Sequence, residues 1–185
     1  MKSKWLLLVL PLFLSACGYN SIQTMDETAA ASKQQIEVQL QRRADLVPNL
    51  VETVKGYAAQ EATIFTAVAE ARAGLLGAVR GGGVQQMATA NDQMTGALGR
   101  LLAISENYPE LKSDQNFLRL QDELAGTENR IAVARTDYNN AVRDYNAYIR
   151  KFPAVLTAKV TGAKSREYFE VTNAAAAEAR RLKVV

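Results

Sequence analysis

The chain has 185 residues, a formal net charge of +3, no histidine and a single cysteine. The lack of histidine removes the commonest general base and metal ligand from the chain. Without the two lysines of the first four residues, 20 basic side chains face 19 acidic ones, so the overall charge gives no argument for nucleic-acid binding.

The N-terminus is typical of a signal peptide covering residues 1–16. Two lysines precede an apolar run from Trp5 to Leu14, about half the roughly 20 residues that a membrane-spanning helix needs. The following sequence, LSAC, ends at Cys17 and resembles the lipobox of bacterial lipoproteins. That resemblance implies a diacylglycerol thioether on Cys17, cleavage before it, and an acyl chain such as palmitate on the new amine. Several acyl chains together would make release from a membrane slow.

Four apolar stripes with steps of three and four residues follow, and such spacing predicts long, coiled-coil-like helices that pack lengthwise. No segment alternates with a period of two, so we expect an all-α protein. The stripes cover residues 22–40, 47–75, 84–108 and 117–152.

Proline, glycine and capping residues separate the stripes. We expect Asp45 and Pro48 to start the second helix, Gly81 to Gly83 to end it, and Pro153 to close the fourth. Pro109 and the pair Ser113-Asp114 separate the third helix from the fourth. Short connections favour antiparallel neighbours, so residues 17–152 are predicted to form an antiparallel four-helix bundle. The alternative is a three-helix rod in which the first two stripes form one helix kinked at Pro48.

Residues 153–185 are predicted to form a less ordered, basic C-terminal tail. From Lys151 onward seven basic side chains face three acidic ones, while residues 17–150 carry a net charge of −3. We expect this tail to touch anionic lipid headgroups, where each Lys or Arg adds up to about 1 kcal/mol of binding.

Three stretches resemble the LemA family: QLQRRADLVPNLVETVKGYA from Gln39, YPELKSDQNFLRLQDEL from Tyr108 and TENRIAVARTDYNNAVRDYN from Thr127. The resemblance covers about residues 19–170. It implies a membrane-tethered, extracytoplasmic helical protein with no settled biochemical activity. Two features depart from the family: a lipobox replaces the usual transmembrane anchor, and Gln60 stands where many members have histidine.

No catalytic residue, metal site or cofactor site is predicted, and the only expected cofactor-like group is the covalent lipid on Cys17. Gly81 to Gly83 lacks the Lys and Ser/Thr of a phosphate loop. The alternative is a carboxylate-dependent cell-envelope hydrolase. Alanine replacement of Glu61, Glu123 and Glu128 would separate the two, since a hydrolase would lose activity while its melting curve stayed unchanged.

Several polar residues are candidates for an interaction surface: Arg42, Arg43, Asp45, Asn49, Asn139 and Asn146. The first four are expected at the corner between the first two helices, where cations suit a helix end and an anion suits a helix start. Asn139 and Asn146 lie one heptad apart, where they could contact a partner or glycan, or simply bond to neighbouring tyrosines. Glu61, on an apolar stripe, would pair with Arg130 or Arg135, or reach out to water.

The sequence therefore predicts a lipid-anchored interaction or scaffold module at the bacterial cell envelope, with an envelope protein as its partner. Gly18 after the cysteine favours the periplasmic face of an outer membrane if the cell has two membranes.

Overall fold

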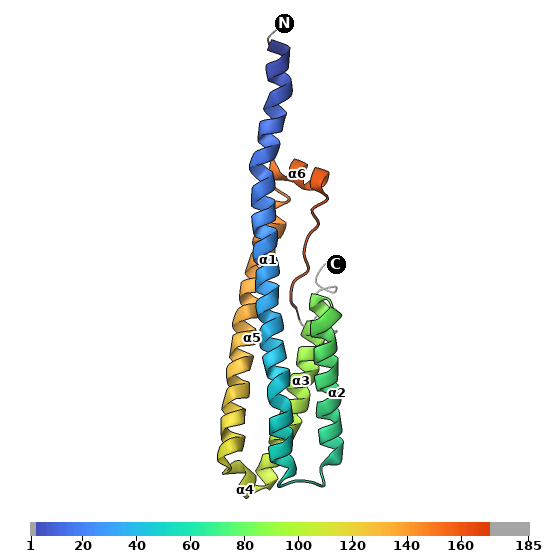
Figure 1. Ribbon diagram of the computed structural model, residues 1–185, viewed down its shortest axis with the longest axis vertical. Helices are drawn as coiled ribbons and strands as arrows, with labels where there is room; N and C mark the ends of the chain where they lie inside the picture. Colours follow the sequence, from blue (N-terminus) through green and yellow to red (C-terminus); the bar gives the residue numbers. More distant parts are fainter. Residues whose placement is uncertain (1–2, 171–185) are drawn as a thin grey trace, which may run out of the picture. The chain divides into compact units, whose positions relative to one another are not determined.

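The computed structural model of the chain describes residues 3–170, and between residues 3 and 17 it describes the backbone alone. These residues form six α-helices and one short 3-10 helix and contain no strand, which confirms the all-α class (Figure 1). In chain order the elements are α1 (Ser3–Lys55), α2 (Ala62–Gly81), α3 (Val84–Ile104), the 3-10 helix η1 (Ser105–Asn107), α4 (Pro109–Lys112), α5 (Gln115–Tyr148) and α6 (Ala154–Thr161).

The glycine turn lies where the sequence predicts it. α2 ends at Gly81, and Gly82 and Gly83 lead directly into α3, so these two helices form the antiparallel hairpin seen in Figure 1. A Cβ atom on Gly82 would lie 2.6 Å from the carbonyl oxygen of Ala78, which is closer than any real Cβ contact. Only glycine fits this turn.

The start of α5 also follows the sequence. The backbone N–H of Phe117 donates to Asp114 Oδ1 at 2.8 Å, so Asp114 occupies one of the free donors at the first turn of α5. The hydroxyl of Tyr57 donates to Asp114 Oδ2 at 3.0 Å and thereby joins the α1–α2 connection to the same corner.

The predicted corner at Pro48 is wrong, because α1 continues through it to Lys55. Asp45 lies inside the helix and accepts a hydrogen bond from Gln41 Nε2 at 2.9 Å, so it caps nothing. Pro48 lacks the N–H that would bond the carbonyl of Ala44 in a regular helix. Arg72 Nε of α2 donates to that carbonyl oxygen at 2.8 Å instead, which gives the physical reason why the helix tolerates its proline. The direction change occurs at residues 56–61.

The chain divides into two compact units. The second unit includes α2, α3, η1, α4, residues 35–55 of α1 and residues 115–133 of α5. Its largest fully buried side chains are Ile36, Leu40, Leu50, Leu75, Met87, Met94, Leu101, Leu111 and Phe117. The heptad-like stripes therefore form this core, although the helix boundaries differ from those of the predicted four-helix bundle.

The first unit combines residues 1–34 with residues 134–168. Its apolar core consists of Ile22 of α1, Tyr145 of α5, Ile149 just after α5, and Ala158 of α6. A Cβ on Gly18 would lie 3.3 Å from Thr157 Oγ1, which shows how closely α1 approaches α6.

The first part of the predicted tail is packed. α6 follows Pro153 and ends at Gly162, whose φ of 72° is the left-handed conformation that glycine adopts easily. An extended segment follows, and we call residues 163–168 the strap. Phe169, next along the chain, is only 1% exposed. Up to Glu170 the chain is therefore not a loose tail, while Arg180, Arg181 and Lys183 lie outside the described residues.

Candidate functional site

Arg43 is buried, although the sequence placed it on a candidate surface. Its side chain lies in the second unit and is 4% exposed as a residue. Nη1 donates to Asn91 Oδ1 of α3 at 2.7 Å and lies 2.5 Å from Glu128 Oε2 of α5. Burial lowers the pKa of Arg43, and the carboxylates of Glu128 and Asp92 oppose that effect. Arg43 thus joins three helices from inside.

The other candidates on α1 do not gather into a corner. Arg42, Asp45 and Asn49 are exposed along one continuous helix. Glu61 is also displaced from its predicted place: it occupies the N-cap position of α2, outside the helix, and is partly exposed. The buried ionic contact in this unit therefore uses Arg43 and Glu128 rather than the predicted Glu61.

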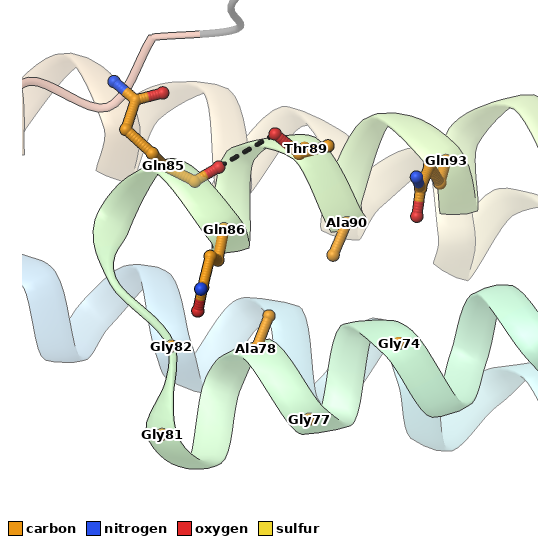
Figure 2. Close-up of a pocket in the computed structure, with 10 residues that line it drawn as sticks. All are labelled: Gly74, Gly77, Ala78, Gly81, Gly82, Gln85, Gln86, Thr89, Ala90 and Gln93. Carbon is orange, nitrogen blue, oxygen red and sulfur yellow. Dashed lines mark hydrogen bonds between the residues drawn. The ribbon is translucent and has the colours of Figure 1, made fainter.

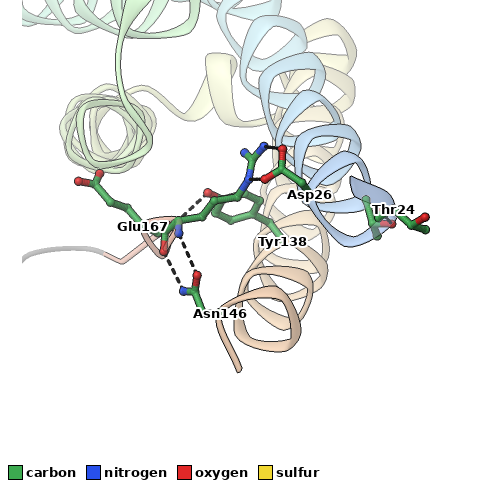
Figure 3. A network of polar contacts seen from close by, with 7 residues as sticks. Thr24, Asp26, Tyr138, Asn146 and Glu167 are labelled. Carbon is green, nitrogen blue, oxygen red and sulfur yellow. Dashed lines mark hydrogen bonds and ion pairs between the residues drawn. The ribbon is translucent and has the colours of Figure 1, made fainter. Parts of the chain in front are cut away.

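Asn146 holds the strap. Its Nδ2 donates to the carbonyl oxygen of Arg166 at 2.9 Å, and its Oδ1 accepts from the Arg166 backbone N–H at 2.9 Å (Figure 3). The amide side chain therefore pairs with both backbone groups of one residue, Arg166, as a residue of a neighbouring β-strand would. Tyr138 lies about two turns before Asn146 on α5. Its hydroxyl donates a hydrogen bond to the carbonyl oxygen of Glu167 at 2.8 Å. Asn139 is partly buried on the same helix and also has an interaction partner.

Asp26 of α1 binds the strap from the other side. Arg166 Nε and Nη2 donate to the two carboxylate oxygens of Asp26 at 2.7 and 2.9 Å (Figure 3). These hydrogen bonds lower the pKa of Asp26 and raise that of Arg166. Burial raises the pKa of nearby Tyr145, and the Asp26 carboxylate adds to that rise.

A cavity of about 400 Å³ opens beside this ion pair. Its polar lining comes from Gln23, Asp26, Thr161, Lys164, Ser165 and Arg166. The acid and the guanidinium that line it already neutralise each other, so Lys164 is the remaining charged side chain of this lining.

A larger groove of about 680 Å³ runs between α2 and α3 (Figure 2). α2 and the turn after it line the groove with small residues, namely Gly74, Gly77, Ala78 and Gly81 of α2 and Gly82 of the turn. α3 lines it with amides and other short side chains, namely Gln85, Gln86, Thr89, Ala90 and Gln93. A second hollow of about 380 Å³ also includes Gln93 and continues along the same two helices to Glu70 and Arg100.

α2 is unusually exposed for so apolar a helix. Among the described residues it is the one helix long and apolar enough to cross a membrane, with a mean hydropathy of 1.3. A single such helix is weak evidence for a membrane span. Only 17% of that window is buried, whereas a core helix of a soluble protein would be mostly buried. Its large side chains Phe65, Val68 and Leu75 are buried, so the exposed part of α2 consists of small and polar residues.

Part of this site was visible in the sequence and part was not. Gly74, Gly77 and Gly81 are spaced by three and four residues in an apolar segment, and this spacing is a sequence signal for a small-residue face. Asp26 and Arg166 are 140 residues apart and carry no local signal for their pairing.

Within the part of the chain that the structure describes, no three His, Cys, Asp or Glu side chains cluster to hold a metal ion. The backbone at Cys17 lies within α1, while its side chain is outside the described residues.

Comparisons with known proteins give one family and a small set of relatives. The LemA family model matches residues 32–184. Similar proteins include magnetosome proteins MamQ 1 and MamQ 2 of Paramagnetospirillum magneticum, each 34% identical over 175 residues, or 82% of this chain and 64% of the relative. Magnetosome protein MamQ of Magnetospirillum gryphiswaldense is 32% identical over 174 residues, with the same shares of each chain. This chain thus spans 64% of the length of these curated relatives.

Proposed function

Since the chain belongs to the LemA family, we propose that it is a membrane-tethered interaction or scaffold module at the bacterial cell envelope. Its similarity to proteins named for the magnetosome supports an association with a bacterial membrane. We propose a binding role instead of a catalytic one, because the two buried or half-buried charged networks hold the fold together: Arg43 joins three helices and Arg166 attaches the strap.

The observation that carries this proposal is the exposed small-residue face of α2 beside the groove on α3. A Cβ on Gly74, Gly77 or Gly81 would meet no neighbouring atom within 4 Å, so packing within the described chain does not require glycine there. Small side chains on a helix allow another helix backbone to come close. We propose that this face binds a protein, because the exposed amides of Gln86 and Gln93 line the groove beside it.

The tether in this proposal is lipid on Cys17, with residues 1–16 removed as a signal peptide. The sequence around Cys17 supports it, and Gly18 supports the periplasmic face of an outer membrane where the cell has two membranes. Metabolic acyl labelling tests the tether: we expect label on the wild-type chain and none on Cys17→Ser. Label that persists in the variant would show that the anchor is elsewhere. Membrane fractionation then identifies the membrane.

The binding face is tested by a photo-crosslinking residue in place of Gly77, in cells. We expect a covalent adduct with a protein, since a Cβ at this position meets nothing within 4 Å. The matched control places the same residue at Asp122, which is exposed on α5 outside the groove. Equal yields from the two positions, or no adduct from Gly77, would contradict the proposed face.

A further inference from the structure

The exposed face of α2 consists of residues at steps of three and four. They are Thr63, Thr66, Glu70, Ala73, Gly74, Gly77, Arg80 and Gly81, and all of them are exposed. Three are glycines inside or at the end of a helix, where glycine is less stable than alanine. A Cβ on any of these three glycines would meet no other atom within 4 Å. Packing within the described chain therefore gives no reason for the missing side chains.

Small residues on a helix face allow a second helix backbone to approach closely, because the interaxial distance depends on the side chains at the contact. A face of this kind accommodates another helix better than it accommodates an extended peptide. The groove beside it adds the exposed amides of Gln86 and Gln93, which can donate to a neighbouring helix. The partner of this face is therefore a helix with similarly short side chains.

The charges on the face identify which helix fits. Glu70 and Arg80 are both exposed and lie ten residues apart, about 15 Å along the helix axis. If two copies of α2 cross in antiparallel orientation with a twofold axis near residue 75, Glu70 of each copy faces Arg80 of the other. The same axis brings Ala73, Gly74 and Gly77 of both copies to the point of closest approach. A parallel pair would place like charges together.

We propose that α2 is a homodimerisation helix and that a second copy of this chain packs on the exposed face of α2 through its own α2, in an antiparallel, twofold-symmetric contact. Such a contact is self-complementary, since each copy presents the same patch to the other. Arg100 of α3, which lines the second hollow together with Glu70, adds a second cation on the side of that carboxylate. This inference rests on the proposed function, because it names the partner of the same face.

Disulfide formation in membranes that contain the full chain tests the proposal. Gly74→Cys lies next to the expected axis, so oxidation should give a species of twice the chain mass on a non-reducing gel. The unsubstituted chain, whose only thiol is Cys17, is the control for any band that does not come from position 74. Adding Gly77→Leu should abolish the species by keeping the two backbones apart.

Charge reversal tests the orientation. Glu70→Arg or Arg80→Glu, each combined with Gly74→Cys, places like charges together at two symmetric positions and should lower the cross-linked fraction about tenfold. The double reversal, E70R with R80E, restores both pairs and should return the fraction to within about twofold of its starting value. Asp122→Arg, with the same change of charge on α5, should have no effect.

Each other outcome overturns a definite statement. A cross-linked species that ignores the reversals would rule out the antiparallel pairing. No species of twice the mass, together with a Gly77 photo-adduct of another mass, would overturn the homodimer and leave the proposed function standing. No adduct in either experiment would overturn both.

Discussion

At the scale of single residues, the two charged networks differ in how much solvent reaches them. Arg43 is 4% exposed, whereas the side chain of Glu128 is 46% exposed. Arg43 Nε is buried without a hydrogen-bond acceptor, and the contacts of this cation with Asn91 and Glu128 are made through Nη1. Substitution of Glu128 and substitution of Arg43 should therefore change the free energy of unfolding by different amounts.

We predict that Glu128→Gln destabilises the protein more than Arg43→Met does. The first substitution leaves a buried cation without its carboxylate and should lower the free energy of unfolding by about 1–3 kcal/mol. The second replaces the cation by an apolar chain of similar length and leaves Glu128 free to hydrate, so its cost should be under about 1 kcal/mol. Urea unfolding of both variants checks the order, and a larger loss for Arg43→Met would contradict it.

The Asp26–Arg166 pair gives a prediction about pH. Because the hydrogen bonds from Arg166 lower the pKa of Asp26, the pair stabilises the strap above the unfolded pKa, about 3.9, and this stabilisation is lost as the pH falls through the folded pKa. Since the Asp26 side chain is 39% exposed, the pair should contribute less than about 1 kcal/mol.

Hydrogen exchange of the Arg166 amide, which donates to Asn146, measures the attachment of the strap. At pH 7 we expect Asp26→Asn to raise its exchange rate by up to about fivefold. Between pH 5 and about pH 3 the wild-type strap should lose protection, relative to intrinsic exchange, while the Asp26→Asn strap should not. If the Arg166 amide lost protection to the same extent in both chains as the pH falls, Asp26 would not be what holds the strap.

At the scale of helices, two glycines in or next to α2 have opposite roles. Gly77 has open space where its Cβ would lie, whereas a Cβ on Gly82 would clash with the Ala78 backbone. In a variant whose dimerisation is weakened, such as Glu70→Arg, we predict that Gly77→Ala raises the free energy of unfolding by about 0.5–1 kcal/mol.

Gly82→Ala should instead lower the free energy of unfolding by about 1–3 kcal/mol, because the turn must shift. Thermal melting monitored by circular dichroism checks both variants. If the two glycines gave changes of the same sign, the close approach at the turn would not be the reason for Gly82.

The proline inside α1 and the arginine on α2 form a second pair at this scale. Arg72 donates to the carbonyl of Ala44, the group that Pro48 leaves without its helical donor. We predict that Arg72→Met costs about 1–2 kcal/mol in the wild-type chain but less in Pro48→Ala, where the new N–H bonds that carbonyl.

A double-mutant cycle over these two positions measures the coupling. Pro48→Ala alone should stabilise the chain by up to about 3 kcal/mol, and Asp45→Ala should change little because Asp45 is not a cap. Independent effects of Arg72→Met and Pro48→Ala would show that the arginine does not compensate for the proline.

At the scale of the whole molecule, the basic C-terminal segment can be divided. Arg166 is paired with Asp26 and is therefore occupied, while Lys151, Lys159 and Lys164 are exposed. We propose that these three lysines meet anionic headgroups, each adding up to about 1 kcal/mol near the surface.

Sedimentation of residues 18–185 with anionic vesicles tests the lysines. Alanine at all three should weaken binding at least about tenfold at low salt, and the difference should shrink as salt is raised. A control with the same loss of charge replaces Arg100, Arg119 and Arg130 by alanine. Deleting everything after Phe152 would be a poorer test, because it also removes the packed strap. Equal binding by both triple variants would exclude a specific role for the lysines.

The sequence by itself determined the features that depend on neighbours within a few residues. Apolar residues at steps of three and four predict the all-α class. Gly81 to Gly83 predict the turn of the α2–α3 hairpin, and Asp114 marks the start of α5. Propensity and capping act locally, so a single sequence carries them.

Only the tertiary structure decided the features in which a distant group reverses a local rule. Pro48 predicts a helix start, yet Arg72 supplies the missing donor from another helix and α1 continues. The sequence suggests that Arg43 is a surface cation, yet the residue is buried and its Nη1 contacts Asn91 and Glu128. The sequence suggests that Asn146 belongs to an exposed surface together with Asn139. In the structure its side chain instead binds Arg166 of the strap, twenty residues further along the chain. In each case the buried or freed polar group must find a partner, and which partner it finds depends on how the helices pack.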